Sequence, residues 1–118
     1  MKIERSLVKG SIEMIMLSEI AESPSHGYGL IITIRRKYHE YFGPSTIYPL
    51  LVQMEKEGIV KSEWLLNSGK PKKLYSITSK GRGLLQAAKM QFAVIARELR
   101  SSEHGELGEK YYIPEQRT

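Results

Sequence analysis

The sequence predicts a mostly α fold with a two-stranded β hairpin. Three observations predict it: three short segments have apolar residues at helical spacing, two short apolar runs flank a polar loop that contains glycine, and a long segment with helical spacing comes last. A length of 118 residues suits one domain with one modest core. With 41% hydrophobic and 26% charged residues, the composition is that of an ordinary globular protein.

The first predicted helix covers residues 4–22 and is apolar on more than one face. Such a helix is usually buried against its own domain and also against a second surface. Pro24 ends it, because proline disfavours helical backbone in the residue before it. The second predicted helix starts with Ser25 as its N-cap. Three basic residues, 35–37, fall in its last turn, where cations stabilise the negative end of the helix dipole.

The third predicted helix runs from about Ser45 to Glu57, and Gly58 is its C-terminal stop. Pro49 is tolerated only in a first helical turn, so the helix is expected to begin at Ser45 or Thr46. Apolar residues at helical spacing predict its buried face, which consists of Ile47, Leu50, Leu51 and Met54. The hydroxyl-bearing residues left outside or at the edges of that face are Ser45, Thr46 and Tyr48.

A hairpin is predicted next, with strands within residues 59–66 and 74–77 and a polar turn at Asn67–Pro71. Thr78 or Ser79 then caps a final helix of roughly 30 Å, at 1.5 Å per residue. The apolar stripe of this helix is too long to be buried in so small a domain, so we expect it to pair with a second copy of the chain. The stripe, which is the predicted dimer interface, consists of Leu85, Ala88, Phe92, Ile95 and Leu99.

Positive charge is concentrated in one short stretch of the chain. The net charge is +5, yet residues 1–59 are neutral overall, with seven basic and seven acidic side chains. Residues 60–82, in contrast, hold six basic side chains and a single acidic one, Glu63. A local basic patch favours a polyanionic partner, although a solvated charged loop would give the same pattern.

Three helices followed by a hairpin is the order of a winged helix-turn-helix, here with a long C-terminal helix added. In that fold the third helix enters the DNA major groove, about 12 Å wide, and the hairpin, or wing, contacts the adjacent backbone. The hydroxyl groups of the third helix would meet DNA there, while cations of the wing would neutralise phosphates. The predicted wing cations are Lys70, Lys72 and Lys73. The expected parts are a winged helix-turn-helix DNA-binding domain at 1–78, a dimerisation helix at 79–100 and a polar, acidic tail at 101–118.

Several short motifs occur in a fixed order: His26–Leu30 (HGYGL), Ser45–Leu51 (STIYPLL), Met54–Val60 (MEKEGIV), Lys72–Thr78 (KKLYSIT) and Gly81. Each is weak alone, but together, over about residues 7–83, the sequence resembles the PadR transcriptional regulators. The resemblance implies a winged helix-turn-helix repressor that dimerises through its C-terminal helix, in the short-tailed branch of the family.

The resemblance also bears on effector binding. Some members of the short-tailed branch bind flat aromatic drugs in a pore between the subunits, where a tryptophan of the last helix stacks on the drug. The one tryptophan of this chain, Trp64, lies instead on the first wing strand. Phe92 offers a weaker aromatic face, so Phe92 and Met90 are the candidate effector contacts, with a place in the dimer core as their alternative role.

Four aromatic residues lie near the predicted DNA surface, and two of them have an alternative role. Tyr48 is expected to contact DNA, or else to pack over its own helical turn. Tyr28 and His26 are expected to shape the start of the second helix, with the glycines on either side of Tyr28 allowing close approach. A phosphate contact is the alternative role of Tyr28. Trp64 is expected to fill the space under the wing.

No pattern of catalytic residues is present, so the protein is not expected to be an enzyme. Its three histidines are far apart in sequence and form no HExxH pair, and cysteine is absent. The sequence has no P-loop, no Gly-x-Ser-x-Gly elbow and no third glycine after Gly27-Tyr28-Gly29, as a dinucleotide loop requires. No cofactor and no metal are therefore expected. The alternative to DNA binding is a winged-helix protein–protein interaction module, against which the six cations within residues 60–82 argue.

The longest unbroken apolar run has five residues, Phe92–Ala96, whereas a membrane span needs about 20. The first residues contain no apolar stretch typical of a signal peptide. We therefore expect a cytoplasmic protein without a membrane partner. Its expected partners are double-stranded DNA with a pseudo-palindromic operator, a second copy of the chain, and a small aromatic effector. Together these expectations describe a homodimeric repressor.

Overall fold

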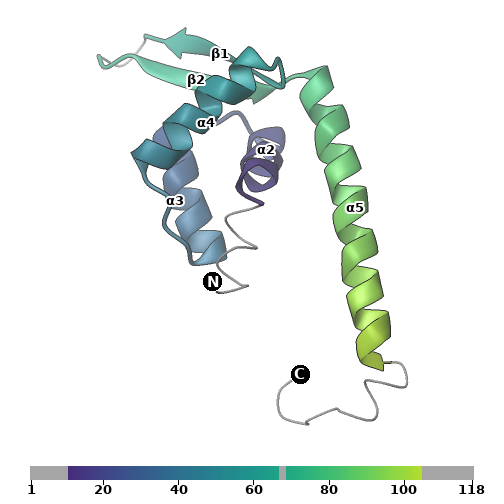
Figure 1. Ribbon diagram of the computed structural model, residues 1–118. Coiled ribbons are helices and arrows are strands. Elements are labelled where there is room, and N and C mark those ends of the chain that lie inside the picture. Colours follow the sequence, from purple (N-terminus) through teal and green to yellow (C-terminus); the bar gives the residue numbers. More distant parts are fainter. Residues whose placement is uncertain (1–10, 67–68, 105–118) are drawn as a thin grey trace. The chain divides into compact units, whose positions relative to one another are not determined.

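The computed structural model describes residues 11–66 and 69–104, and it confirms a mostly helical fold with one two-stranded antiparallel sheet. The elements, in chain order, are α2 (Ile12–Glu22), α3 (Gly27–Tyr38), α4 (Pro44–Lys56), β1 (Val60–Leu65), β2 (Lys72–Ile77) and α5 (Ser79–His104), as Figure 1 shows. The part of the first predicted helix before residue 11 lies outside the described residues. So do residues 105–118 of the predicted tail, whereas 101–104 belong to α5.

The chain divides into two compact units, Met1–Leu85 and Gln86–Thr118. We call the first the winged unit. Within it α3 packs on α2 and α4, and the hairpin contacts all three of these helices. The first turns of α5 belong to the winged unit, and the rest of the helix belongs to the second unit. No helix among the described residues is long and apolar enough to cross a membrane.

The core of the winged unit is built from the apolar faces that helical spacing predicts. Among the described residues every buried side chain in it is hydrophobic, so burial of apolar surface is its main source of stability. On α4 the predicted face is confirmed, with three of its residues buried and Leu50 partly buried. The fully buried side chains are Met16, Ile20, Leu30, Ile34, Ile47, Leu51, Met54, Ile59 and Val60.

The start of α3 differs from the prediction. Its N-cap is His26, with extended backbone, and not Ser25. Ser25 instead forms an antiparallel bridge with Tyr75 of β2: its N–H donates to the Tyr75 carbonyl at 3.0 Å and its carbonyl accepts from the Tyr75 N–H at 2.9 Å. Because both backbone groups of Ser25 pair with β2, the carbonyl that accepts the first helical hydrogen bond is that of His26, from the N–H of Leu30 at 3.0 Å, and the helix begins at Gly27.

Pro49 lies deeper in its helix than predicted. Gly43 is the N-cap of α4 and Pro44 occupies the first turn, a position that suits the fixed φ of proline. The helix therefore begins before Ser45, and Pro49 falls in its second turn, inside the helix. The ladder loses the one hydrogen bond that Pro49 cannot donate to the carbonyl of Ser45, and the helix continues to Lys56.

Gly58 ends α4 as predicted. It adopts the left-handed conformation, with φ of 76°. Its N–H donates to the Glu55 carbonyl and the N–H of Ile59 donates to the Met54 carbonyl, both at 3.0 Å. These two bonds are those of a Schellman motif, which satisfies the last carbonyls of a helix.

A compact joint connects the end of α4 to the start of α5. The Thr78 hydroxyl donates to the Gly58 carbonyl at 2.6 Å and accepts from the N–H of Gly81 at 3.0 Å, so Thr78 is the predicted cap of α5. The Lys80 ammonium donates to the Glu57 carbonyl at 2.8 Å. A Cβ at position 81 would overlap the carbonyl oxygen of Ile59, so this close approach requires glycine.

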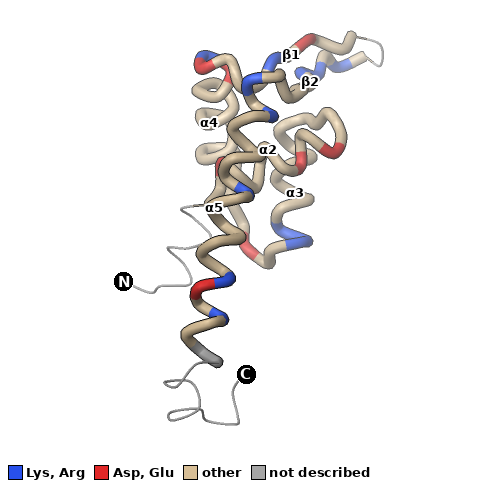
Figure 2. Tube along the Cα trace, turned by 90° about the vertical axis from the view of Figure 1, so that its right-hand side faces the viewer, with Lys and Arg blue, Asp and Glu red and all other residues tan. Residues whose placement is uncertain are grey.

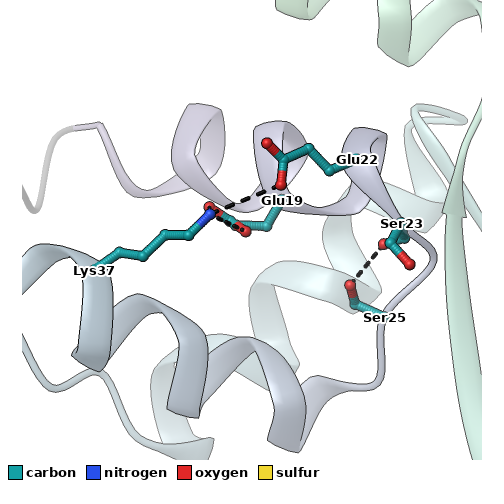
Figure 3. Close-up of polar contacts among 5 residues, drawn as sticks. All are labelled: Glu19, Glu22, Ser23, Ser25 and Lys37. Atoms are coloured by element: carbon teal, nitrogen blue, oxygen red, sulfur yellow. Dashed lines mark hydrogen bonds and ion pairs between the residues drawn. The ribbon is translucent and has the colours of Figure 1, made fainter.

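An ion pair joins α2 to α3. The Lys37 ammonium donates to both carboxylate oxygens of Glu19, at 2.9 and 3.1 Å, and lies 3.7 Å from Glu22, as Figure 3 shows. The hydrogen bond to Glu19 raises the pKa of Lys37 above its ordinary value. Lys37 is exposed, so the pair contributes little to stability, but it fixes one of the three cations that were assigned to the helix dipole.

Gly81→Ala is expected to lower the free energy of unfolding by about 1–3 kcal/mol, because overlap with a backbone carbonyl cannot be relieved by rotating a side chain. Gly83→Ala is the matched control: a Cβ there meets no atom within 4 Å, and alanine in a helix is favoured over glycine by about 0.5–1 kcal/mol. Urea denaturation followed by circular dichroism measures both variants. Equal stabilities for the two would contradict the packing described at Gly81.

Candidate nucleic-acid interface

A cleft of about 580 Å³ lies between the start of α3, the first half of α4 and the hairpin. Its walls carry aromatic rings from all three segments together with two lysines of β2, and none of the described residues that line it is acidic. Figure 1 shows the end of β1, the start of β2 and the beginning of α4 on the same side of the winged unit. The lining residues used below are Tyr28, Tyr48, Trp64, Lys72, Lys73 and Tyr75.

The ring of Tyr48 is positioned by Gly27. A Cβ on Gly27 would overlap Cε1 of Tyr48 and lie 2.8 Å from Cζ, so the ring packs directly on the first residue of α3. Tyr48 remains 41% exposed, and the contact therefore orients the ring without removing it from solvent. The predicted close approach at Gly29 is wrong, because a Cβ there meets nothing within 4 Å.

The wall of the cleft on β2 is fixed by the chain that precedes α3. Besides the bridge between Ser25 and Tyr75, Nδ1 of His26 lies 3.2 Å from the carbonyl oxygen of Lys73. Tyr75 is buried, and burial raises the pKa of its hydroxyl above the ordinary value, with smaller contributions from Glu55 and Tyr48. Its hydroxyl therefore stays protonated and neutral at physiological pH.

Lys73 and Trp64 face each other across the hairpin. They are partners in the strand register, and the Lys73 ammonium lies 5.6 Å from the centre of the Trp64 ring and 5.9 Å from that of Tyr75. Both distances are within the range of a cation–π interaction. The ammonium is also 3.8 Å from Oε1 of Glu55, a separation too long for a hydrogen bond.

Trp64 does not fill the space under the wing as predicted. It lies on the same face of β1 as Val60 and Ser62, because alternate residues of a strand share a face. Val60 is buried in the core, but the hairpin extends past the core and leaves Trp64 60% exposed. The exposed tryptophan beside a lysine was not predicted. The pairing of positions 64 and 73 in a hairpin would have indicated that the two side chains are neighbours, but not that the ring is exposed.

The predicted DNA-contacting residues come together in part. Tyr28, Tyr48, Lys72 and Lys73 line the cleft, and Tyr28 is 66% exposed. Ser45 and Lys70 are exposed and Thr46 is half-buried, but these three are not among the lining residues. Figure 2 shows the basic positions of the hairpin along both strands. Whether any of these residues contacts DNA stays a prediction.

Residues 16–87 match the family model described as "Transcriptional regulator PadR-like family". This chain belongs to that family. The match begins within α2 and extends through α3, α4 and the hairpin to the first turns of α5, so it includes all the segments that line the cleft. The resemblance inferred from the sequence motifs is thereby confirmed, and the chain is a transcriptional regulator of the PadR family.

Relatives of this PadR-family chain include the transcriptional regulator Rv3488 of Mycobacterium tuberculosis, 28% identical over 96 residues, which are 80% of this chain and 88% of that protein. A crystal structure of a PadR-like regulator, BC4206 from Bacillus cereus, has a TM-score of 0.77 at 27% identity and covers 86% of this chain and 99% of its own. A PadR-family regulator from Eggerthella lenta has a TM-score of 0.70 at 31% identity, with 82% and 81% covered.

The residues predicted for α5 fall into two groups. Leu85 is buried in the core of the winged unit, whereas Ala88 is half-buried and the rest of the predicted stripe is exposed in the single chain. The predicted effector contacts Phe92 and Met90 are exposed as well and do not line the cleft. Within residues 11–66 and 69–104, no group of three or more acidic or histidine side chains is placed to hold a metal ion.

Proposed function

We propose that this PadR-family regulator binds double-stranded DNA as a homodimer and represses transcription from a pseudo-palindromic operator. One observation carries the proposal: exposed tyrosines of α3 and α4 and the lysines of β2 gather on one surface of the winged unit, without an acidic side chain among the described lining residues. Lysines neutralise phosphates, and that interaction supplies much of the affinity for DNA.

On this proposal α4 is the helix that enters the major groove. Its N-terminal half presents Ser45 and Tyr48 to solvent, and the N-terminal residues of a recognition helix are the ones that meet base edges. The wing lies beside it, so that Lys72 and Lys73 would contact phosphates of the strand next to α4. The two α4 helices of a dimer would occupy grooves about one helical turn, or roughly 34 Å, apart.

The dimer would be held by α5. Ala88, Phe92, Ile95 and Leu99 repeat at intervals of four, three and four, which is the spacing of a coiled-coil seam. Phe92, Ile95 and Leu99 are 43%, 54% and 67% exposed in the single chain, which is far more than a core stripe retains. A second copy of the same helix would cover them. A small aromatic effector near Phe92 and Met90 stays a prediction.

Selection of bound DNA from a random pool, with footprinting of the selected sequences at two salt concentrations, tests the proposed function directly. A sequence-specific regulator is expected to enrich a pseudo-palindromic site and to protect both half-sites. Failure to retain any DNA at low salt would favour the alternative, a winged-helix module that binds another protein.

Replacement of Lys70, Lys72 and Lys73 by alanine is expected to weaken binding to all DNA sequences and to lower the slope of log K against log salt by up to about 0.9 for each phosphate that the variant no longer neutralises. Fluorescence anisotropy at several salt concentrations measures the slope. The matched control replaces Lys89, Arg97 and Arg100 of α5, which removes the same charge from exposed positions outside the winged unit. Equal slopes for the two triple variants would exclude a role of the wing.

Gly27→Ala is expected to weaken operator binding by about tenfold, or roughly 1.4 kcal/mol, because the added methyl group displaces the Tyr48 ring from its place beside α3. Gly29→Ala is the control, since its Cβ meets no neighbour within 4 Å. Binding is measured with the selected operator, and thermal melting shows whether both variants fold. Identical affinities for the two folded variants would remove the orientation of Tyr48 from the proposed interface.

Ile95→Asp is expected to convert the dimer to a monomer, because a carboxylate in an apolar helix seam is costly to bury. Ala93→Asp introduces the same charge into the same helix, about 160° around the helix axis from Ile95 at 3.6 residues per turn. Light scattering of both variants gives the oligomeric state. A dimeric Ile95→Asp variant would contradict the proposed seam.

A further inference from the structure

The cleft beside the wing has the size and lining of a small-molecule site. Its volume of about 580 Å³ falls within the range of roughly 300–1,000 Å³ that is usual for such sites. Apolar and aromatic side chains form most of its walls, and the polar groups among them are few. It is built from backbone that is tied together by the Ser25–Tyr75 bridge, so the cleft exists before any ligand arrives.

Its aromatic wall offers surface for a planar ring. Trp64 and Tyr28 are 60% and 66% exposed, and both line the cleft. Stacking of a base on an exposed aromatic side chain stabilises nucleic-acid complexes by about 1–3 kcal/mol per base. The two rings therefore suit a flat heterocycle.

Its lysines offer charge for an anionic group. Lys72 forms no ion pair with any described residue. Lys73 forms one ion pair, with Glu55 at 3.8 Å, a separation too long for a hydrogen bond. Both lysines line the cleft from the start of β2, next to Pro71. The tyrosine hydroxyls and His26 add groups that can hydrogen-bond to a sugar. A ring, a sugar and an anionic group together are the chemistry of a nucleotide.

We propose that the cleft binds a free mononucleotide, with its base against Trp64 and Tyr28 and its phosphate at Lys72 and Lys73. The same side chains belong to the surface proposed for DNA, so a bound mononucleotide and a bound operator exclude each other. The nucleotide would then release the regulator from DNA by competing directly for the surface that binds the operator. Mutual exclusion rests on the proposed function, whereas nucleotide binding by the cleft does not.

Trp64 makes the proposal measurable, because it is the single tryptophan of the chain and its fluorescence reports on the cleft alone. Titration of the full chain with adenosine 5′-monophosphate (AMP) is expected to change this emission with saturation. Adenosine lacks the phosphate and ribose 5-phosphate lacks the base. Each is expected to reach half-saturation only at a concentration at least about tenfold higher than AMP, since each lacks one of the two contacts.

Three outcomes of that titration would overturn the proposal. If AMP did not change the Trp64 emission, the cleft would not be a nucleotide site. If adenosine reached half-saturation at the same concentration as AMP, the lysines would play no part in binding. If ribose 5-phosphate did so, the rings would play no part. Quenching by single-stranded oligothymidylate without quenching by AMP would assign the cleft to a DNA strand and not to a free nucleotide.

Variants separate the cleft from the rest of the wing. Lys72→Ala with Lys73→Ala, and separately Tyr28→Ala, is expected to raise the AMP concentration at half-saturation by about tenfold, because each removes one class of contact. Lys61→Ala is the control, since Lys61 is an exposed lysine of the same hairpin that does not line the cleft. Equal weakening by all three would point to general attraction of anions and would overturn the proposed site.

Competition is measured last, by anisotropy of labelled operator DNA at increasing AMP. The apparent dissociation constant for DNA is expected to rise in proportion to AMP once the cleft is filled, and Lys61→Ala should behave like the unchanged chain. An operator affinity that is constant at AMP concentrations that saturate the Trp64 signal would overturn mutual exclusion. If no DNA is bound at all, the proposed function fails, while the Trp64 titration still decides whether the cleft binds the nucleotide.

Discussion

Two backbone hydrogen bonds between Ser25 and Tyr75 attach the wing to the start of α3, and the candidate interface depends on them. A two-stranded hairpin alone is marginally stable in water. The bridge gives β2 a second neighbour on the side away from β1 and fixes its height relative to α3. Nδ1 of His26, close to the Lys73 carbonyl, extends this attachment toward the tip of the wing. The rings and the lysines therefore face each other because the backbone holds both walls.

The helix that carries Tyr48 is constrained at both ends. At its start the Tyr48 ring packs on Gly27, where there is no room for a side chain. At its end Gly58 closes a Schellman motif, and the Thr78 hydroxyl binds the Gly58 carbonyl. The proposed function needs such constraints, because a helix that enters the major groove must be held by its scaffold if its side chains are to meet bases with defined geometry. In this chain two glycines and one threonine provide that support.

The elements of the fold could be predicted from the sequence because their signals are local. Apolar spacing, Gly58 and Thr78 each act within a few residues, and the helices, the hairpin and the cap of α5 follow from them. The pairing of Ser25 with Tyr75 could not be predicted, because no local pattern reveals a bridge between residues 50 positions apart. Because of this bridge α3 begins later than predicted, and because of Pro44 α4 begins earlier than predicted.

The candidate site was predictable to the extent that charge and motif order indicated it. The lysines of the wing stand out in the composition of residues 60–82, and Tyr28 and Tyr48 stand out in the family motifs. The exposure of Trp64 was not predictable, since tryptophan is usually well buried and its solvent contact depends on how far the hairpin extends past the core. Gly29 was expected to allow a close approach because it belongs to a family motif. In this structure a Cβ at position 29 would meet no atom within 4 Å, so packing does not require glycine there.

The Thr78 joint has a mechanical consequence. The Thr78 hydroxyl donates to the carbonyl of Gly58, two residues after α4, and accepts from the N–H of Gly81 in the first turn of α5. The Lys80 ammonium bonds the Glu57 carbonyl, and Gly81 packs against the backbone of Ile59. The first turn of α5 therefore cannot pivot independently of α4. Any change in the direction of this first turn would therefore have to be shared by the end of α4, because the two are bonded to the same threonine.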